Sequence, residues 1–276
     1  MLSQDKINEE LFNQLKNDLI QIFDSESVHV LDNLALLSVK HNSSLNNAIF
    51  PVKRNKILQL EKEGKLVFPQ ARVIRLIQDK GVQKQFFKEN DIPTAHFQLV
   101  NSKEDLLVTN FTYPYILKQR KDGYDGKGVK KISNIEAIDN AFDAPSLIEE
   151  LVDFEKEIAV IVARNSNGDI KTFPMVEMEF NPEANLVEFL ISPSTYPDDI
   201  QEKAEKIAMN IATALNITGI LAVEMFVTKD GDILVNEVAP RPHNSGHQTI
   251  EGNYVSQFEQ HLRAIFNLPL GDTRSL

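Results

Sequence analysis

The feature that most constrains the fold is a pair of apolar stretches, GILAVEMFV and ILVNEVAP, joined around the short segment KDGD. An Asp-Gly dipeptide between two such stretches is typical of a two-residue β-hairpin turn. With residues 230–231 as the turn, Lys229 pairs with Asp232. Counting outward then places Glu224 directly opposite Glu237. The sequence therefore predicts an antiparallel hairpin that holds two carboxylates side by side.

Two acids in this register repel each other, because cross-strand neighbours have Cβ atoms roughly 5 Å apart. Strand alternation also predicts apolar residues on the same face as the two acids: Ile220, Ala222, Phe226, Ile233 and Val235. A Mg²⁺ ion held by both carboxylates and by substrate phosphates would offset the repulsion. Three alternatives stay open: the face is exposed to solvent, a Lys or Arg pairs each acid, or the register slips by one residue.

The remaining pattern predicts an α+β protein whose sheets are covered by helices. Helices are expected over 3–23, 55–64, 70–79, 81–90, 103–108, 134–142, 198–215 and 255–267. Ser102 and Ser133 are the expected caps of the helices over 103–108 and 134–142. Besides the hairpin, strands are expected over 65–69, 95–100, 113–119, 127–132, 146–150, 156–164, 170–179 and 186–191.

Composition excludes several classes of function. The 276 residues carry a formal net charge of −11, whereas a duplex-binding protein presents a basic face, so nucleic acid is not an expected partner. No apolar run approaches the roughly 18 residues of a membrane span, and the N-terminal residues lack the pattern of a secretory signal. The chain has no cysteine, which excludes thiol chemistry and agrees with a cytoplasmic location.

Three of the 11 glycines fall in GYDGKG, residues 123–128, between two expected strands and close to Lys118. Glycines let backbone amides wrap phosphate oxygens, and a nearby lysine supplies a point charge. The spacing is not that of a P-loop, and taken alone the segment is more typical of a hairpin turn. Similarly, EELV at 149–152 could read an adenine through its backbone, but sequence alone does not separate it or Glu157 from ordinary strand residues.

The segment RPHNSGH, residues 241–247, concentrates hydrogen-bond donors shortly after Glu237. Its two histidines have the spacing of a zinc pair only on a helix, and Pro242 and Gly246 argue against a helix. A guanidinium, imidazoles, an amide and a hydroxyl beside a carboxylate pair suit an anionic substrate or a developing acyl phosphate.

Together, VFPQARVIRLIQDK, LKQRKDGYDGKG, GILAVEMFV and NEVAPRPHNSGHQTIEG resemble the 5-(carboxyamino)imidazole ribonucleotide synthases, ATP-grasp ligases of purine biosynthesis, over about residues 56–272. The resemblance implies the ATP-grasp fold, in which two α+β subdomains grip ATP between antiparallel sheets, with a reduced N-terminal α/β segment. It implies a carbon–nitrogen ligase reaction: ATP phosphorylates bicarbonate to carboxyphosphate, and the amine of aminoimidazole ribonucleotide captures the carboxyl. ADP and phosphate are the other products, and a homodimer is expected.

The resemblance also implies a role for individual residues. Expected contacts of ATP, including the lid over its phosphates, are Lys80, Lys118, Gly123, Tyr124, Asp125, Gly126, Lys127, Gly128, Val129, Glu149, Glu150, Leu151, Val152, Glu157, Asn236 and Glu237. The expected ligands of Mg²⁺, or of Mn²⁺ in its place, are Glu224 and Glu237. Expected contacts of the imidazole nucleotide are Tyr124, Asp125 and the catalytic set Arg241, His243 and Asn244, with Arg241 stabilising charge on carboxyphosphate.

The expected domains are an N-terminal segment over 1–69, a small subdomain over 70–151 and a large subdomain over 152–276. The chain departs from the family in three places. Residues 1–54 contain no glycine where the family has a glycine-rich turn, no C-terminal β-rich domain follows Leu276, and Phe180 replaces a histidine. Two alternatives remain: another ATP-grasp ligase such as a biotin carboxylase, against which Ala239 counts, or a non-catalytic nucleotide-binding remnant.

Overall fold

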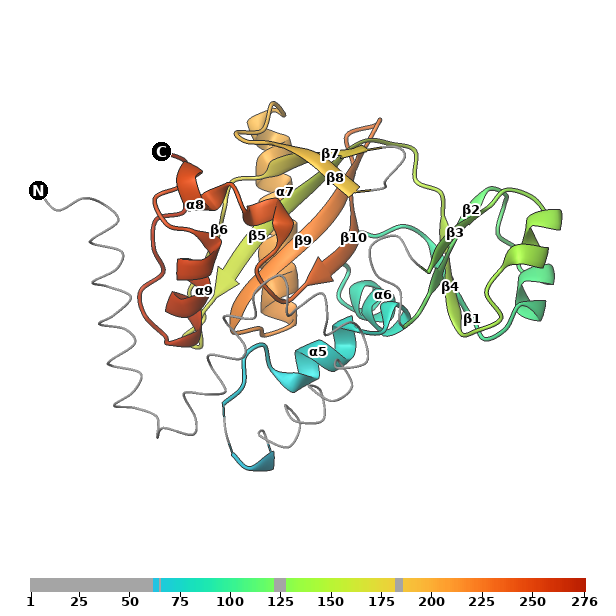
Figure 1. Cartoon of the computed structure of the whole chain (residues 1–276), viewed down its shortest axis with the longest axis horizontal. Helices are drawn as coiled ribbons and strands as arrows, with labels where there is room; N and C mark the ends of the chain where they lie inside the picture. The colour runs from blue at the N-terminus through green and yellow to red at the C-terminus, as the bar shows by residue number, and fades with distance from the viewer. Residues whose placement is uncertain (1–61, 65, 122–127, 182–185) are drawn as a thin grey trace, which may run out of the picture. The chain divides into compact units, whose positions relative to one another are not determined.

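The computed structural model describes residues 62–64, 66–121, 128–181 and 186–276. By its contacts the chain divides into the units Met1–Lys56 and Ile57–Leu276, and every described residue lies in the second. The expected helix over 3–23 therefore lies outside the described residues. The described part consists of two antiparallel sheets with helices packed on them, which confirms the α+β class (Figure 1). None of its helices is long and apolar enough to span a bilayer.

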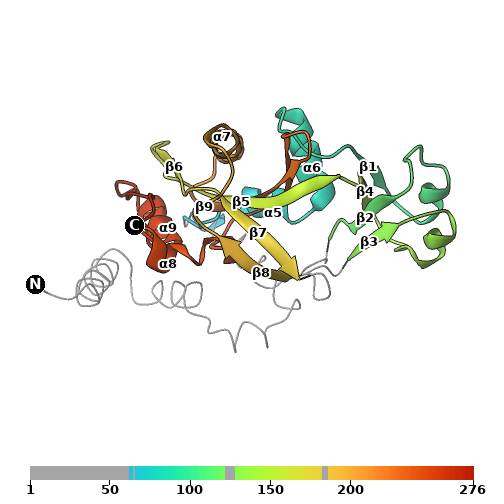
Figure 2. The same ribbon diagram turned by 90° about the horizontal axis from the view of Figure 1, so that it is seen from above.

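The larger sheet has the strand order β10-β9-β5-β7-β8, and β6 also pairs with β5. Its strands are β5 Phe154–Arg164, β6 Ile170–Thr172, β7 Val176–Asn181, β8 Leu186–Ile191, β9 Gly219–Thr228 and β10 Ile233–Ala239. Helix α7, Asp198–Ala214, covers one face of this sheet (Figure 2). Helix α9, Gln257–Ile265, follows the short helix α8, Thr249–Gly252, and packs against β9 on the opposite face.

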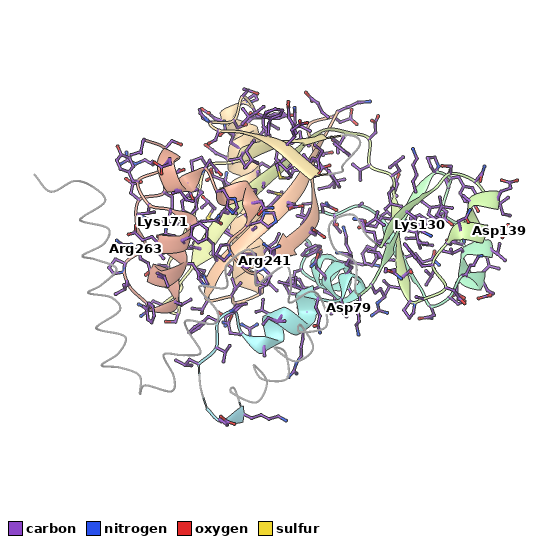
Figure 3. The ribbon with its side chains drawn as sticks, viewed as in Figure 1. Asp79, Lys130, Asp139, Lys171, Arg241 and Arg263 are labelled. Carbon is purple, nitrogen blue, oxygen red and sulfur yellow. The ribbon has the colours of Figure 1, made fainter. Side chains whose placement is uncertain are left out.

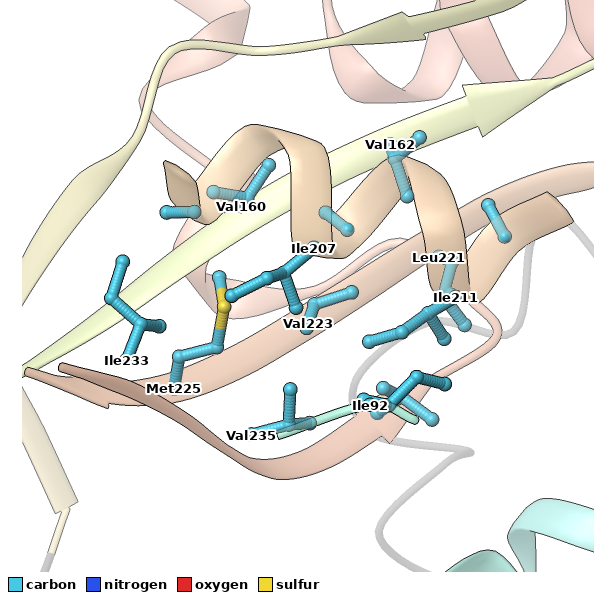
Figure 4. Packing of buried hydrophobic residues seen from close by; sticks show 14 of the residues in the cluster. Ile92, Val160, Val162, Ile207, Ile211, Leu221, Val223, Met225, Ile233 and Val235 are labelled. Carbon is cyan, nitrogen blue, oxygen red and sulfur yellow. The ribbon is translucent and has the colours of Figure 1, made fainter. Parts of the chain in front are cut away.

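The main core lies between the larger sheet and α7. Alternate residues of β5 and β9 point toward the helix, and Figure 4 shows them beneath Ile207 and Ile211. Val160 and Val223 in this layer are fully buried, which is the period-two pattern of a strand with one face on a helix. The other face of the same strands is apolar around Ile220 and Ala222, on the side where α9 packs, and carries Glu157 and Glu224 toward the opposite end.

The smaller sheet has the strand order β1-β4-β2-β3, with the bounds β1 Phe97–Val100, β2 Tyr115–Gln119, β3 Val129–Ile132 and β4 Ser146–Glu150. Two short 3₁₀ turns, Glu104–Leu107 and Glu136–Asn140, cover it through the buried side chains of Leu106 and Ile138. Because β4 pairs with β1 on one side and β2 on the other, the backbone of β4 is used within the sheet.

Two further helices, α5 and α6, precede the sheets in sequence and pack beside them. Helix α5, Ala71–Ile77, caps the C-terminal end of α7, because Arg72 donates to the Leu215 carbonyl at 2.6 Å. Helix α6, Lys80–Glu89, begins at Asp79, whose carboxylate accepts the N–H groups of Gly81 and Val82. This cap fixes the first residue of α6, Lys80, near the end of β2, since the Lys80 N–H donates to the Arg120 carbonyl at 2.9 Å.

Most expected helices and strands are present within a few residues of their predicted bounds, but four local predictions were wrong. Residues 66–69 form no strand. Residues 103–108 and 134–142 form only short 3₁₀ turns, and Asp105 and Asn134 rather than the two serines accept the local N–H groups. The single strand expected over 170–179 is two, because Pro174 has no N–H for the ladder.

A buried histidine makes stability depend on pH. The His261 Nδ1 accepts the Ile220 N–H at 3.2 Å, and burial lowers the pKa of His261 to about 4. Since the folded-state pKa lies below the ordinary value of 6.5, the unfolded state binds more protons between the two values, and stability falls as pH drops through that window. We expect His261 to contribute a loss of about 2 kcal/mol between pH 7 and pH 5. In urea unfolding at both pH values, the change in stability of His261→Asn should differ from that of the unchanged protein by about this amount, whereas the same change in both proteins contradicts the assignment.

Candidate active site

The hairpin of β9 and β10 brings Glu224 opposite Glu237, by a different route from the predicted one. Thr228 pairs with Asp232 through an N–H···O bond of 2.8 Å, so the loop has three residues and ends at Gly231 with φ of 80°. That shift alone would misalign the two acids. A register irregularity between Val235 and Glu237 compensates for it, and the two carboxylates face each other as predicted.

The extra residue of this β-bulge is Asn236, and it changes which side chains share a face. The predicted placement of Ile233 and Val235 beside Glu237 was wrong, because both point into the core under α7. A bulge lets consecutive side chains project to one side of a strand. Both Asn236 and Glu237 accordingly reach basic groups outside the larger sheet.

Three cationic or imidazole side chains meet the acidic and amide groups of the hairpin. Lys80 Nζ, at the start of α6, lies 3.0 Å from Glu237 Oε2, and Lys118 Nζ, in β2, donates to Asn236 Oδ1 at 2.9 Å. His243 Nε2 lies 3.2 Å from Glu224 Oε1. Groups from α6, the smaller sheet, the hairpin and the following loop therefore converge on one site.

The surroundings of the two acids shift their pKa values in opposite directions. Burial, followed by the charges of Glu237 and Glu157, raises the pKa of Glu224 to about 7. Burial alone would also raise the pKa of Glu237, but the Lys80 ammonium keeps that pKa below its ordinary value. The pKa values of the two acids move apart, as expected for carboxylates placed side by side. One alternative that the sequence left open, a lysine partner, is present for Glu237.

Glu157 lies on the same face, between Phe226 of β9 and Met178 of β7. Burial raises its pKa to about 7. Next to it, β5, β7 and β8 form a mostly buried apolar cluster, whose members are Ala159, Val176, Met178, Phe180, Val187 and Leu190. Phe180, which the resemblance led us to expect in place of a histidine, packs in this apolar cluster.

The loop after β10 is held in place by Gln257, which belongs to no recognisable motif. His243 donates its N–H to Gln257 Oε1 at 2.9 Å, and Gln257 Nε2 donates back to the His243 carbonyl at 2.7 Å. The Ser245 N–H donates to His243 Nδ1, so the neutral ring carries its proton on Nε2, toward Glu224. Burial lowers the pKa of His243 to about 4, with the Arg241 charge adding to the shift.

We expect Gln257→Leu to destabilise the protein by about 2 kcal/mol, because it leaves the His243 N–H without a partner and leaves the His243 carbonyl only the Gly246 N–H. The free energy of unfolding in urea measures this loss. Gln85→Leu, on the exposed side of α6, is the control and should change stability by less than about 0.5 kcal/mol. Equal stability of the two variants would contradict the assigned role of Gln257.

Among the remaining expected site residues, Arg241 and Asn244 are exposed on the loop that follows β10, where Figure 3 labels Arg241. Gly128, with φ of 84°, directly precedes β3, and Val129 is the first residue of that strand. Leu151 and Val152 follow β4 and lie outside its ladder, whereas Glu150 is its last residue. The expected residues Gly123, Tyr124, Asp125, Gly126 and Lys127 lie outside the described residues.

The structure revises the role of Glu149. Its backbone pairs with β1 and β2, and its side chain is buried between Lys84 and Lys118 at 2.5 Å from each ammonium. Glu149 is therefore engaged within the protein rather than turned toward an adenine. Sequence reasoning missed Lys84 altogether, because it belongs to no recognisable motif.

No group of three or more His, Asp or Glu side chains among the described residues has the geometry of a complete metal site. The donors present are two carboxylates and one amide oxygen, Glu224, Glu237 and Asn236. These are hard oxygen ligands, and a Mg²⁺ site of this kind is completed by water and by substrate phosphates rather than by more side chains. The residues therefore fit a divalent cation that arrives with a phosphorylated ligand.

Two antiparallel sheets with basic and acidic groups converging between them define the ATP-grasp class. The ATP-grasp domain model matches residues 85–258, and the chain belongs to this family. The predicted fold is thereby confirmed.

Within the family, the relatives point to one kind of ligase. The N5-carboxyaminoimidazole ribonucleotide synthase of Bacillus subtilis is 41% identical over 74% of this chain and 55% of its own length. The synthetase of Thermotoga maritima matches with a TM-score of 0.72 and 43% identity, over 81% of this chain and 58% of that one. A synthase from Aspergillus clavatus, solved with ADP and 5-aminoimidazole ribonucleotide, matches with a TM-score of 0.72 and 30% identity over 80% and 60%. The chain spans between about a fifth and three fifths of the length of such relatives.

Proposed function

We propose that this chain carries the Mg-ATP site of an ATP-dependent carbon–nitrogen ligase that carboxylates 5-aminoimidazole ribonucleotide with bicarbonate in purine biosynthesis. The products are 5-(carboxyamino)imidazole ribonucleotide, ADP and phosphate. The observation that carries the proposal is the bulged hairpin, which presents Glu224, Asn236 and Glu237 to lysines from α6 and β2. The relatives named as synthases of this product supply the reaction class.

In the proposed complex, Lys80 and Lys118 bind the ATP phosphates, and Glu224 and Glu237 hold Mg²⁺, or Mn²⁺ in its place. A bound cation would neutralise charge on the transferring phosphate. Lys80 can leave Glu237 for a phosphate oxygen because the cation takes its place beside the carboxylate. A cation would likewise favour ionised Glu224, whose pKa of about 7 reflects burial and repulsion in its absence.

The partly exposed members of the apolar cluster of β5, β7 and β8 suit the purine ring, which stacks on apolar side chains and needs few polar contacts; these members are Phe180, Val187 and Leu190. We assign the polar edge of the adenine to the backbone of Leu151 and Val152, which follows the last ladder pair of β4. Glu157 lies beside the apolar cluster and is the proposed acceptor for the ribose hydroxyls. This assignment shifts the adenine contact from Glu149 to the two residues beyond β4.

Arg241, His243 and Asn244 are the proposed groups at the bicarbonate and the imidazole nucleotide. Phosphoryl transfer to bicarbonate creates an acyl phosphate, and the exposed guanidinium of Arg241 can bind its oxygens in a bidentate way. When the amine attacks the carboxyl carbon, phosphate leaves and the amine loses a proton. The departing phosphate takes this proton, and the neutral His243 ring, which contacts Glu224, is the proposed contact of the reacting amine. Tyr124 and Asp125 remain proposed contacts from the sequence.

Phosphate release from Mg-ATP by the full chain tests the proposal. We expect release that requires both aminoimidazole ribonucleotide and bicarbonate, with ¹⁴C from bicarbonate appearing in the nucleotide product. Binding of Mg-ATP without any such release would contradict the ligase activity and favour a nucleotide-binding remnant. A homodimer and a cytoplasmic location are further proposals, supported by the resemblance and by the lack of cysteine, and light scattering of the purified chain tests the first.

A further inference from the structure

A buried ion cluster lies behind Lys118. One oxygen of the Glu149 carboxylate contacts Lys118 Nζ and the other contacts Lys84 Nζ, each at 2.5 Å. The Lys84 and Glu149 side chains are 3% and 5% exposed, whereas that of Lys118 is 14% exposed. Lys84 also donates to Thr94 Oγ1 and to the Val235 carbonyl. Neither Lys84 nor Glu149 has open access to a ligand, but Lys118 reaches Asn236 at the site.

The positive and negative charges of the cluster do not cancel. Two ammonium groups share one carboxylate, so the three groups carry a net charge of +1. Burial alone would raise the pKa of Glu149, but Lys118 and Lys84 hold that pKa below its ordinary value and keep the group ionised. Burial lowers the pKa of Lys84, and the Glu149 charge opposes that shift. If Lys84 were absent, Glu149 and Lys118 would form a neutral pair.

We propose that Lys84 is a positioning residue that sets the charge of the phosphate site from behind. Lys84 compensates part of the negative charge of the Glu149 carboxylate, so the positive charge of Lys118 stays available for the polyphosphate of a nucleoside triphosphate. Lys84 acts through Glu149 and touches no ligand itself. The inference rests on the proposed function, in which Lys118 binds the ATP phosphates.

A purely structural role for Lys84 is the competing account. Its bond to the Val235 carbonyl lies directly before Asn236, so loss of Lys84 could weaken nucleotide binding by moving β10. The two accounts differ in what happens when Glu149 is neutralised as well. Neutralising Glu149 restores the charge of Lys118 but does not restore the bonds of Lys84 to Thr94 and Val235.

The dissociation constant of Mg-ATP, measured by calorimetry on the full chain, separates the accounts. We expect Lys84→Met to weaken binding about tenfold, because Lys118 is then neutralised by Glu149. Glu149→Gln should tighten binding about threefold, because a negative charge beside Lys118 is gone. The double variant should return to within about threefold of the unchanged protein.

A double variant as weak as Lys84→Met, or a Glu149→Gln variant weaker than the unchanged protein, would overturn the inference in favour of a structural role. Lys131→Met, on the exposed edge of β3, removes the same charge at the surface and should change binding less than about twofold. If Lys84→Met does not fold by circular dichroism, the direction of change in Glu149→Gln decides. Failure of the unchanged chain to bind Mg-ATP would contradict the proposed function itself, whereas normal binding by Lys84→Met contradicts only this inference.

Discussion

Replacing Glu237 by Gln should lower ATP-dependent phosphate release about 10³-fold, because one of two carboxylate ligands of the cation is lost. The substitution keeps the size of the side chain and its place in the bulge. Since the Glu237 side chain is 46% exposed and its partner Lys80 24% exposed, both can be solvated, and the fold should survive. The rate of phosphate release at saturating Mg-ATP measures the effect, and circular dichroism checks the fold.

Asp230→Asn is the matched control for this variant. Asp230 belongs to the same hairpin but lies exposed in its loop, so its rate should stay within about twofold of the unchanged protein. A rate for Glu237→Gln that also stays within twofold would show that the carboxylate pair is not a metal site. Raising the Mg²⁺ concentration should partly restore Glu237→Gln, since the remaining ligands still bind the ion weakly.

Arg241→Ala should lower turnover about 10²- to 10³-fold while leaving the dissociation constant of Mg-ATP nearly unchanged. The guanidinium is exposed on the loop after β10, and its one described hydrogen bond is to the neighbouring Pro242 carbonyl at 3.0 Å. Its removal therefore costs little folding stability. The variant loses contacts with the oxygens of the acyl phosphate and keeps the contacts with the nucleotide. Substitutions of the lysines should instead weaken the binding of Mg-ATP.

Steady-state turnover and calorimetry on the same preparation measure the two quantities. Arg274→Ala, near the C-terminal end of the described chain, removes an exposed guanidinium that pairs with Asp272 and should change neither. A large loss of Mg-ATP affinity in Arg241→Ala would instead assign Arg241 to the nucleotide. Unchanged turnover would remove Arg241 from the catalytic set.

Periodicity was enough to predict most helices and strands, since amphipathic segments such as α7 and alternating strands such as β2 depend on local burial patterns. The 3₁₀ turns over 104–107 and 136–140 were missed because their backbone is set by packing on the smaller sheet. The hairpin shows that counting residues outward from an expected turn does not by itself predict the register. Two errors, in the turn length and in the absence of a bulge at Asn236, cancelled to give the right pairing of the acids.

The site was predictable where motifs carried it and not elsewhere. Lys118, Glu224 and Glu237 lie in recognisable segments, and the structure brings them together. Lys84 and Gln257 are single residues of helices, and nothing in the pattern of a helix marks a lysine that will be buried against a carboxylate of another sheet. The arrangement of β4 and α6 shows why Lys84 matters, and the packing of α9 against the loop after β10 shows why Gln257 does.

Calorimetric titration of the full chain with ATP, in excess Mg²⁺ and in EDTA, tests most directly whether the bulged hairpin is a cation site for ATP. We expect binding at least about tenfold tighter with Mg²⁺, because the cation bridges the carboxylates and the phosphates. The double variant Glu224→Gln, Glu237→Gln should lose this difference. Equal affinity with and without Mg²⁺, or the same Mg²⁺ dependence in the double variant, would contradict the account.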